Sequence, residues 1–353
     1  MSCYLKTILQ HIFIWTFAIV FWSMMREFGQ ELVEGPTFSS FGRRAAIYLT
    51  VGITFGLLIG SFDYFFGRRR ISQTSFGISV VIGASIYAVL IYLMVLIGIT
   101  IFLIGNEDEI TVSQYSDFLL SSEMVLLFAY MFLFGFLVHM TKQIDRKFGP
   151  GNLWRMLTGR FYSPREVEGI FMFLDLKAST TIAESIGHIR YSSLVQDFFR
   201  DLGVVARYDA EVYQYVGDEA VLTWKLENGL RTANCLNAFF AFKAKLARRS
   251  EYYTTRYGLV PEFKAGLNAG KIVMAEVGEI KREIAHHGDT INTAARIQGA
   301  CNEFGAELLI SENLHQMIDW PSNPDLQASQ IGDILLKGKT QAVKLYAVEK
   351  VDV

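Results

Sequence analysis

Apolar residues are distributed unevenly along the chain, and long uncharged stretches are confined to about the first 140 residues. A helix needs about 20 predominantly apolar residues to cross a bilayer. Stretches of this kind occur at residues 7–25, 45–66, 76–104 and 123–140. Four in one block favour membrane helices over the buried helices of a soluble protein. No small-residue cleavage site follows the first stretch, so we expect a membrane helix there and not a signal peptide.

Basic residues in the short loops predict the orientation of these spans. Three arginines follow the second span at 68–70, and three basic residues lie in 142–147 after the fourth, whereas 105–122 contains no Lys or Arg. Arg43 and Arg44, at the outer end of the second span, are the exception. Because cytoplasmic loops are enriched in Lys and Arg, we expect a multi-pass protein of the cell's inner (plasma) membrane with both termini in the cytoplasm.

Few polar residues fall within the predicted spans. His11 and Asp63 lie near span ends, where either a functional or an interfacial role is open. The spans carry no row of charged residues for a transport path, so the block, embedded in membrane lipid, is interpreted as an anchor or a sensor.

The overall composition limits the possible partners and compartment. The net charge of −2 gives no electrostatic reason to expect a nucleic-acid partner. The three cysteines, Cys3, Cys235 and Cys301, are widely separated and odd in number. They form neither a disulfide framework nor a metal-binding spacing, which fits a reducing compartment.

The remainder of the chain alternates between strand and helix patterns, and Gly149, Pro150 and Gly151 break the connection before it. The order of the early elements is β-α-β-β-α-β, which predicts an α+β ferredoxin-like sheet with helices on one face. We therefore expect a transmembrane domain at 1–140, a cytoplasmic linker at 141–167 and a catalytic domain at 168–353. The elements expected in order are a strand ending at Asp175, helices near 179–187 and 191–206, a hairpin turning at Gly217-Asp218, a helix at 228–250, a strand pair bent around glycines at 262–278, a helix at 288–305 opened by Asp289 or Thr290 as N-cap, and closing strands at 306–311 and 334–350.

Two aspartates are expected to meet at one edge of this sheet. Asp175 ends the first strand and Asp218 lies at the hairpin tip, and in this topology the first strand lies beside the hairpin. Close carboxylates repel unless a cation lies between them, and hard oxygen ligands suit Mg²⁺ together with substrate phosphates. The small residues after Asp175, including Ser179 and Thr180, would let phosphate approach the backbone at a helix start. Helix capping and ordinary turn formation are the alternatives for these residues.

Further candidates lie toward the C-terminus. Asn292 and Arg296 are four residues apart and therefore share a helix face. An arginine there could stabilise charge developing on a transferred phosphorus; a solvated surface arginine is the alternative. Lys337 and Lys339 flank Gly338, where either a phosphate contact or a plain lysine turn is possible.

These motifs resemble the catalytic domain of class III adenylate and guanylate cyclases. The matching stretches are FLDLKAST, YVGDEAV, GLNAG, GDTINTAAR and LLKGKT, in family order across about residues 168–350. The resemblance implies that two Mg²⁺ or Mn²⁺ ions bind Asp175, Asp218 and the carbonyl of Leu176. It also implies that Asn292 orients the ribose, Arg296 supports the transition state and Lys337 contacts the triphosphate. Family enzymes are dimers that share each site between chains, so we expect a homodimer that converts ATP, or GTP, to the cyclic nucleotide and pyrophosphate.

The two positions that read the base in this family depart from its pattern. Gln214 stands where adenylate cyclases usually carry Lys, and Ala285 stands where they usually carry Asp or Thr. The Glu and Cys of guanylate cyclases are also absent. A Gln amide donates and accepts, so it could face either purine. We expect ATP to be preferred. His286 or His287 could contact the base in place of the missing side chains. The alternative is that these two histidines are simply packed or solvated.

Three other functions are each supported by part of the sequence. A guanylate cyclase is open because of Gln214. A diguanylate cyclase is suggested by VGDE, but the Asn292 and Arg296 pair and the LKGK stretch argue against it. A degenerate cyclase domain that acts only in signalling or dimerisation is favoured by the altered base readers and opposed by the retained Asp, Asn and Arg residues.

Overall fold

The structure is a computed structural model in which the chain divides into two compact units, Met1–Lys147 and Phe148–Val353. Each unit is described by itself. The residues that it describes are 3–34, 38–67, 76–105, 121–149, 154, 158–159, 163–280 and 282–351.

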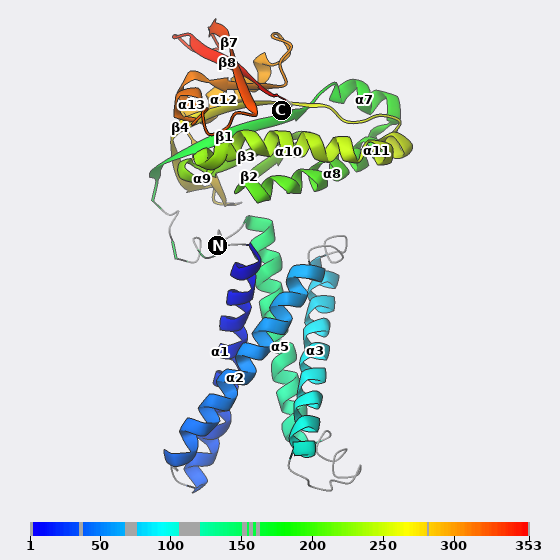
Figure 1. The fold of residues 1–353 in the computed structure, drawn as a ribbon, viewed down its shortest axis with the longest axis vertical. Coiled ribbons are helices and arrows are strands. Elements are labelled where there is room, and N and C mark those ends of the chain that lie inside the picture. The colour runs from blue at the N-terminus through cyan, green and yellow to red at the C-terminus, as the bar shows by residue number, and fades with distance from the viewer. Residues whose placement is uncertain are drawn as a thin grey trace. The chain divides into compact units, whose positions relative to one another are not determined.

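The first unit consists of long apolar helices (Figure 1). They are α1 (Cys3–Glu34), α2 (Phe38–Phe62) with the short π-helix η1 (Asp63–Gly67), α3 (Phe76–Gly105) and α5 (Ser122–Phe148). Four segments are long and apolar enough to cross a membrane, namely Thr7–Met25, Tyr48–Phe65, Gly77–Ile97 and Met124–Asp145. The prediction of four apolar helices is confirmed. The arginines at 68–70 and residues 106–120 lie outside the described residues.

A polar cluster joins these four helices. The Lys142 Nζ of α5 lies 2.6 Å from the His11 Nε2 of α1, 2.9 Å from the Asp63 Oδ2 after α2, and 3.4 Å from the Tyr87 hydroxyl of α3. The Tyr87 hydroxyl also donates to Asp63 Oδ1 at 3.2 Å. His11 is only 1% exposed, so its ring is buried among the helices of this unit. The ammonium of Lys142 thus contacts polar groups on the other three helices.

We expect Lys142→Met to destabilise the helical unit, because it leaves the Asp63 carboxylate without its cation. Polar contacts between membrane helices contribute about 1–2 kcal/mol at most, so the melting temperature in detergent should fall measurably. Fluorescence of the buried Trp15 reports the transition. Thr141→Val is the control, since the Thr141 hydroxyl donates only within its own helix, to the Leu137 carbonyl. Equal melting of the two variants would contradict a stabilising role for the cluster.

The second unit is built on one mixed sheet with the strand order β2-β3-β1-β4-β6-β8-β7, and β5 pairs with β4. The pairs β2–β3, β3–β1 and β1–β4 are antiparallel, whereas β4–β6 is parallel. The first four strands thus have the ferredoxin-like order, as predicted. The elements are β1 (Arg165–Leu176), α7 (Ser179–Ile186), α8 (His188–Leu202), η3 (Gly203–Tyr208), β2 (Glu211–Val216), β3 (Glu219–Lys225), α9 (Leu226–Leu230), η4 (Arg231–Ala233), α10 (Asn234–Arg248), α11 (Ser250–Tyr257), β4 (Phe263–Val277), β5 (Glu283–His287), α12 (Asp289–Ala300), β6 (Leu308–Ser311), α13 (Glu312–Met317), β7 (Leu326–Ile334) and β8 (Val343–Lys350).

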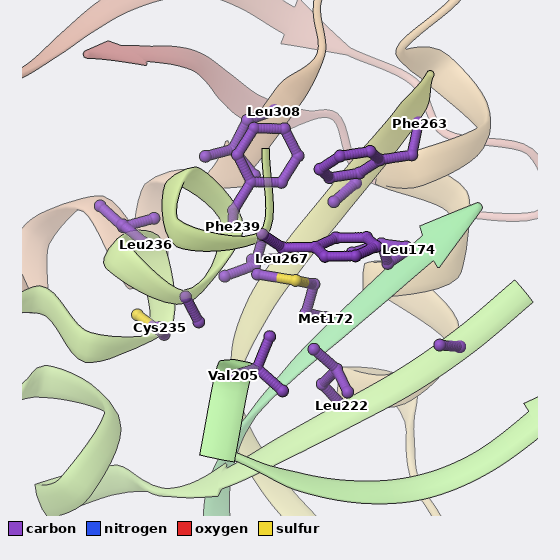
Figure 2. Packing of buried hydrophobic residues seen from close by; sticks show 14 of the residues in the cluster. Met172, Leu174, Val205, Leu222, Cys235, Leu236, Phe239, Phe263, Leu267 and Leu308 are labelled. Atoms are coloured by element: carbon purple, nitrogen blue, oxygen red, sulfur yellow. The ribbon is translucent and has the colours of Figure 1, made fainter. Parts of the chain in front are cut away.

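The main hydrophobic core lies between one face of the sheet and helices α8 and α10. Alternate residues of β1, such as Met172 and Leu174, point into it, as strand periodicity requires. Figure 2 shows these side chains with Leu267 of β4 and Phe239 of α10. The intervening β1 residues therefore face the opposite side of the sheet.

That opposite face is also covered, so the expectation of helices on one face only is wrong. Phe171, Val221 and Ile272 form an apolar patch there with Ala294 of α12. Gly266 lets α12 approach the strand, because a Cβ at this position would lie 2.1 Å from the Gln298 backbone nitrogen. The glycines of β4 thus serve close helix packing.

Three boundaries also differ from the predictions. The segment 262–278 contains one continuous strand, β4, and not a bent strand pair. Helix α12 ends at Ala300, before a turn that closes at Gly305, where φ is +61°. Its N-cap is Gly288, and neither Asp289 nor Thr290 caps it. Strand β7 had no counterpart in the sequence prediction.

Candidate active site

The candidate site begins where β1 ends. In the sheet, Asp175 of β1 is directly opposite Glu219 of β3 on one side and Lys264 of β4 on the other. Asp218 precedes Glu219 in the two-residue turn between β2 and β3. Gly217 has φ of +64° and is the first central residue of this turn, a position that requires such a conformation in type II′ hairpins. The hairpin predicted at Gly217-Asp218 is therefore present, and it brings Asp218 to the same edge as Asp175.

The carboxylates of this edge repel one another. Burial, followed by the charge of Asp218, raises the pKa of Asp175 above its ordinary value. Burial, followed by Asp175 and Asp218, raises the pKa of Glu219 to about 7. Lys264 opposes these shifts with its Nζ 3.6 Å from Asp175 Oδ2, and Gln298 Nε2 of α12 donates to the same oxygen at 3.0 Å. The edge thus has an excess of negative charge that a bound cation would offset.

These shifts predict a pH dependence of stability in the absence of metal. The folded pKa of Glu219 lies above the unfolded value of 4.5. Its contribution to stability is therefore fully present below pH 4.5 and is lost as the pH rises through about 7. In EDTA, the melting temperature of the full chain should fall over this window, and Glu219→Gln should reduce the fall. An identical pH profile in the variant, measured by scanning calorimetry, would contradict this assignment.

The turn after β1 leads into α7. Ala178 has φ of +54° and is the N-cap, so the alternative that Ser179 or Thr180 caps the helix by its side chain is wrong. Burial, followed by the charge of Asp218, raises the pKa of Tyr191 of α8. The Tyr191 hydroxyl therefore lies within the electrostatic influence of the hairpin tip.

A second group of candidates lies on α12 and the loop before β8. A Cβ at Gly338 would lie 3.3 Å from Arg296 Nη2, so this loop runs against the guanidinium. Lys339 is paired with Asp289, and that pairing lowers the pKa of Asp289. Lys337 is exposed. In the described part of the chain, no hydrogen bond or ion pair joins Asn292 or Arg296 to Asp175, although Gln298 of the same helix donates to that carboxylate.

The two expected base-reading positions lie on β2 and β5, and the strand register places only Gln214 on the face that α12 covers. Gln214 of β2 is exposed and is opposite Val221, which belongs to that face. Ala285 of β5 is opposite Ala275. His286 packs with its ring 4.2 Å from that of Tyr213, and burial, followed by the neighbouring His287, lowers its pKa to about 4. The packed-histidine alternative describes His286, whereas His287 is exposed.

Sequence reasoning missed four residues of the site. They are Tyr191, Glu219, Lys264 and Gln298. Glu219 and Lys264 could have been found by writing out the strand register around Asp175, because directly opposed residues of antiparallel strands are neighbours. Tyr191 and Gln298 depend on how α8 and α12 pack, and no local sequence signal marks them.

Comparisons with known proteins identify the family of the second unit. The model of the adenylate and guanylate cyclase catalytic domain matches residues 162–350. Adenylate cyclase 2 of Rhizobium meliloti is 33% identical over 194 residues, which cover 55% of this chain and 53% of the relative. Adenylate cyclase 1 of the same organism is 27% identical over 232 residues, covering 61% and 32% respectively. The chain thus spans about half or less of the length of these relatives.

Among solved structures, a bacterial light-regulated adenylyl cyclase superposes with a TM-score of 0.53 at 18% identity, covering 65% of this chain and 66% of that one. At this identity the likeness concerns the fold alone. The family match extends over more than half of the chain and contains every strand of the sheet. This chain belongs to the adenylate and guanylate cyclase family.

Proposed function

We propose that the chain is a membrane-bound adenylate cyclase that converts ATP to 3′,5′-cyclic AMP and pyrophosphate. The observation that carries this proposal is the carboxylate edge, where the register of β1 with β3 and the β2–β3 turn bring Asp175, Asp218 and Glu219 together. The two relatives from Rhizobium meliloti are named adenylate cyclases. In the reaction, the ribose 3′-oxygen forms a bond to the α-phosphorus, the bond from that phosphorus to the pyrophosphate oxygen breaks, and the 3′-hydroxyl proton is released.

The residues present fit two divalent cations, Mg²⁺ or Mn²⁺. The hard oxygen donors of this edge are Asp175, Asp218 and the carbonyl of Leu176. Lys264 does not fully offset the burial and the neighbouring charge that raise the pKa of Asp175. The described residues contain no group of three or more His, Cys, Asp or Glu side chains arranged to hold a metal. Water and substrate phosphates would therefore complete the coordination. Bound cations would lower the pKa of the attacking hydroxyl and stabilise charge on the leaving group.

The second group of residues acts on the nucleotide from another chain. Asn292 would orient the ribose, Arg296 would stabilise charge on the reacting phosphorus, and Lys337 would contact the triphosphate. Ser179 and Thr180 would offer backbone N–H groups to phosphate. Arg296 packs against the Gly338 loop of its own chain, and the resemblance to the family implies that this group completes the metal-binding half of a second chain. A homodimer would supply two such sites.

The nucleotide base would be read by Gln214, since Ala285 has no hydrogen-bonding side chain. A single ambivalent amide gives modest selectivity, so ATP should be preferred with measurable turnover of GTP. A guanylate cyclase is the second candidate, and the ability of Gln214 to donate and accept favours it. The presence of Asp175, Asp218, Asn292 and Arg296 opposes a purely structural, inactive cyclase domain.

The proposal is tested in cells that lack their own adenylate cyclase. Expression of the full chain should raise intracellular cyclic AMP, whereas expression of Asp218→Asn at equal level should not. Equal cyclic AMP in both strains, or none in either, would contradict the assigned activity.

We also propose that both termini lie in the cytoplasm, where the nucleotide substrate is found. Reporter fusions test this directly. A fusion after residue 115 should be active only as an extracytoplasmic reporter, and a fusion after residue 150 only as a cytoplasmic one. An extracytoplasmic signal at 150 would rule out the assigned topology and the cytoplasmic location of the reaction.

A further inference from the structure

The two expected base-reading strands are tied together by one aromatic pair. The Tyr213 ring of β2 stacks on the His286 ring of β5, with centroids 4.2 Å apart and planes inclined by 20°. The backbone N–H of His286 donates to the Tyr213 hydroxyl at 3.1 Å. Tyr213 directly precedes Gln214, and His286 directly follows Ala285. The pair therefore joins the neighbours of both positions.

A bulge in β2 gives the pair its orientation. The pairing register of β2 with β3 shifts between Val212 and Gln214, which makes Tyr213 the extra residue. Tyr213 packs on the apolar cluster that contains Val221, and Gln214 is opposite Val221. Directly opposed residues have their side chains on the same face of a sheet. Tyr213 and Gln214 are consecutive, yet both lie on the face where the base would bind.

The His286 ring makes aromatic packing contacts and no ring hydrogen bond among the described residues. Phe171 contacts its edge at 5.6 Å between centroids, with planes inclined by 75°. Among the described residues, neither ring nitrogen of His286 has a hydrogen-bond partner, although both atoms are buried. Because burial lowers the pKa of His286 to about 4, the ring is uncharged at neutral pH. The contacts of His286 are thus the rings of Tyr213 and Phe171 and the hydrogen bond from its backbone N–H to the Tyr213 hydroxyl.

We propose that Tyr213 and His286 are positioning residues that set nucleotide specificity by fixing the strand that carries Gln214 against β5. This inference rests on the proposed function, in which Gln214 faces the base. The stack and the bond between His286 N–H and the Tyr213 hydroxyl hold β5 against β2, so that the Gln214 amide meets the base edge in one geometry. A wider or mobile gap lets the amide accommodate adenine and guanine more equally.

Tyr213→Phe tests this inference because it removes the hydroxyl and keeps the ring. The ratio of kcat/KM for ATP to that for GTP should change toward unity by roughly 3- to 10-fold, the effect of losing one hydrogen bond. The change should appear mainly in KM, with kcat for ATP nearly retained. Tyr215→Phe is the matched control, since Tyr215 lies on the same strand but packs on Phe199 of α8. His286→Phe, which keeps a stacking ring and the backbone N–H, should leave the ratio close to wild type.

The measurement uses the full chain in nanodiscs and adds equilibrium binding of 3′-deoxyATP and 3′-deoxyGTP, which bind without cyclising. An unchanged kcat/KM ratio and unchanged binding ratio in Tyr213→Phe would overturn the inference. A large change in His286→Phe would overturn it as well, because the imidazole itself would then read the base. If the wild type binds both nucleotides but makes no cyclic product, the proposed function fails, and the binding ratios of the variants still decide the positioning role.

Discussion

Asp175→Asn and Asp218→Asn are each expected to abolish nucleotide turnover. Each replaces a charged oxygen ligand with a neutral amide at the edge where the two carboxylates meet. Metal ligation contributes several kcal/mol to such reactions, so the loss should be about 10³-fold or more in kcat. The measurement is initial-rate assay of the full chain with saturating Mg²⁺ or Mn²⁺.

Folding must be shown to survive in these variants. Because the carboxylates repel each other, neutralising Asp175 should leave the melting temperature in EDTA unchanged or raise it. Asp333→Asn is a suitable control for the metal-binding residues, as Asp333 is exposed on β7, which β4, β6 and β8 separate from β1. Near-normal turnover by either Asp175→Asn or Asp218→Asn would contradict the proposal that both aspartates bind the cations.

Mixing two inactive variants is expected to restore activity. Asp175→Ala lacks the metal half of the site and Arg296→Ala lacks the transition-state half, while each retains the other half. In a mixed dimer, one of the two sites carries both defects and the other carries none. If chains pair at random, half of the dimers are mixed, so activity should recover to about one quarter of the wild-type value.

The pairing of chains needs its own control. Co-expression of the variants with different affinity tags, followed by tandem purification, isolates the mixed dimers alone. Asp175→Ala mixed with Asp218→Ala should remain inactive, because both substitutions fall in the same half of the site. No recovery in purified mixed dimers of Asp175→Ala and Arg296→Ala would mean that each chain holds a complete site.

The fold was largely predictable because its signals are local. The apolar stretches of the first unit overlap all four observed membrane-length segments, and the fourth segment extends to Asp145. The order β-α-β-β, with a glycine where the hairpin needs positive φ, placed Asp175 and Asp218 at one edge. Strand β7 was missed, and α12 was assigned to the wrong face. The packing of α12 depends on Gly266 and Ala294, whose small size has no periodic signature.

The remaining site residues depend on contacts between distant parts of the chain. Lys264 neighbours Asp175 only through the register of β1 with β4. Gln298 reaches Asp175 across 123 residues, through the packing of α12 on the sheet. In the first unit, Lys142 meets His11 across 131 residues. Hydropathy identifies such helices, but it does not say which polar residues face one another.

The most direct test of the central claim is product analysis of the purified full chain. The chain, reconstituted in nanodiscs, is incubated with ATP and Mg²⁺, and separately with GTP, and the products are identified by chromatography and mass spectrometry. We predict 3′,5′-cyclic AMP and pyrophosphate in equal amounts from ATP, a slower yield of cyclic GMP from GTP, and neither product from Asp175→Asn. Cyclic di-GMP from GTP, hydrolysis of ATP to ADP, or no product from either nucleotide would contradict the assignment as a nucleotide cyclase.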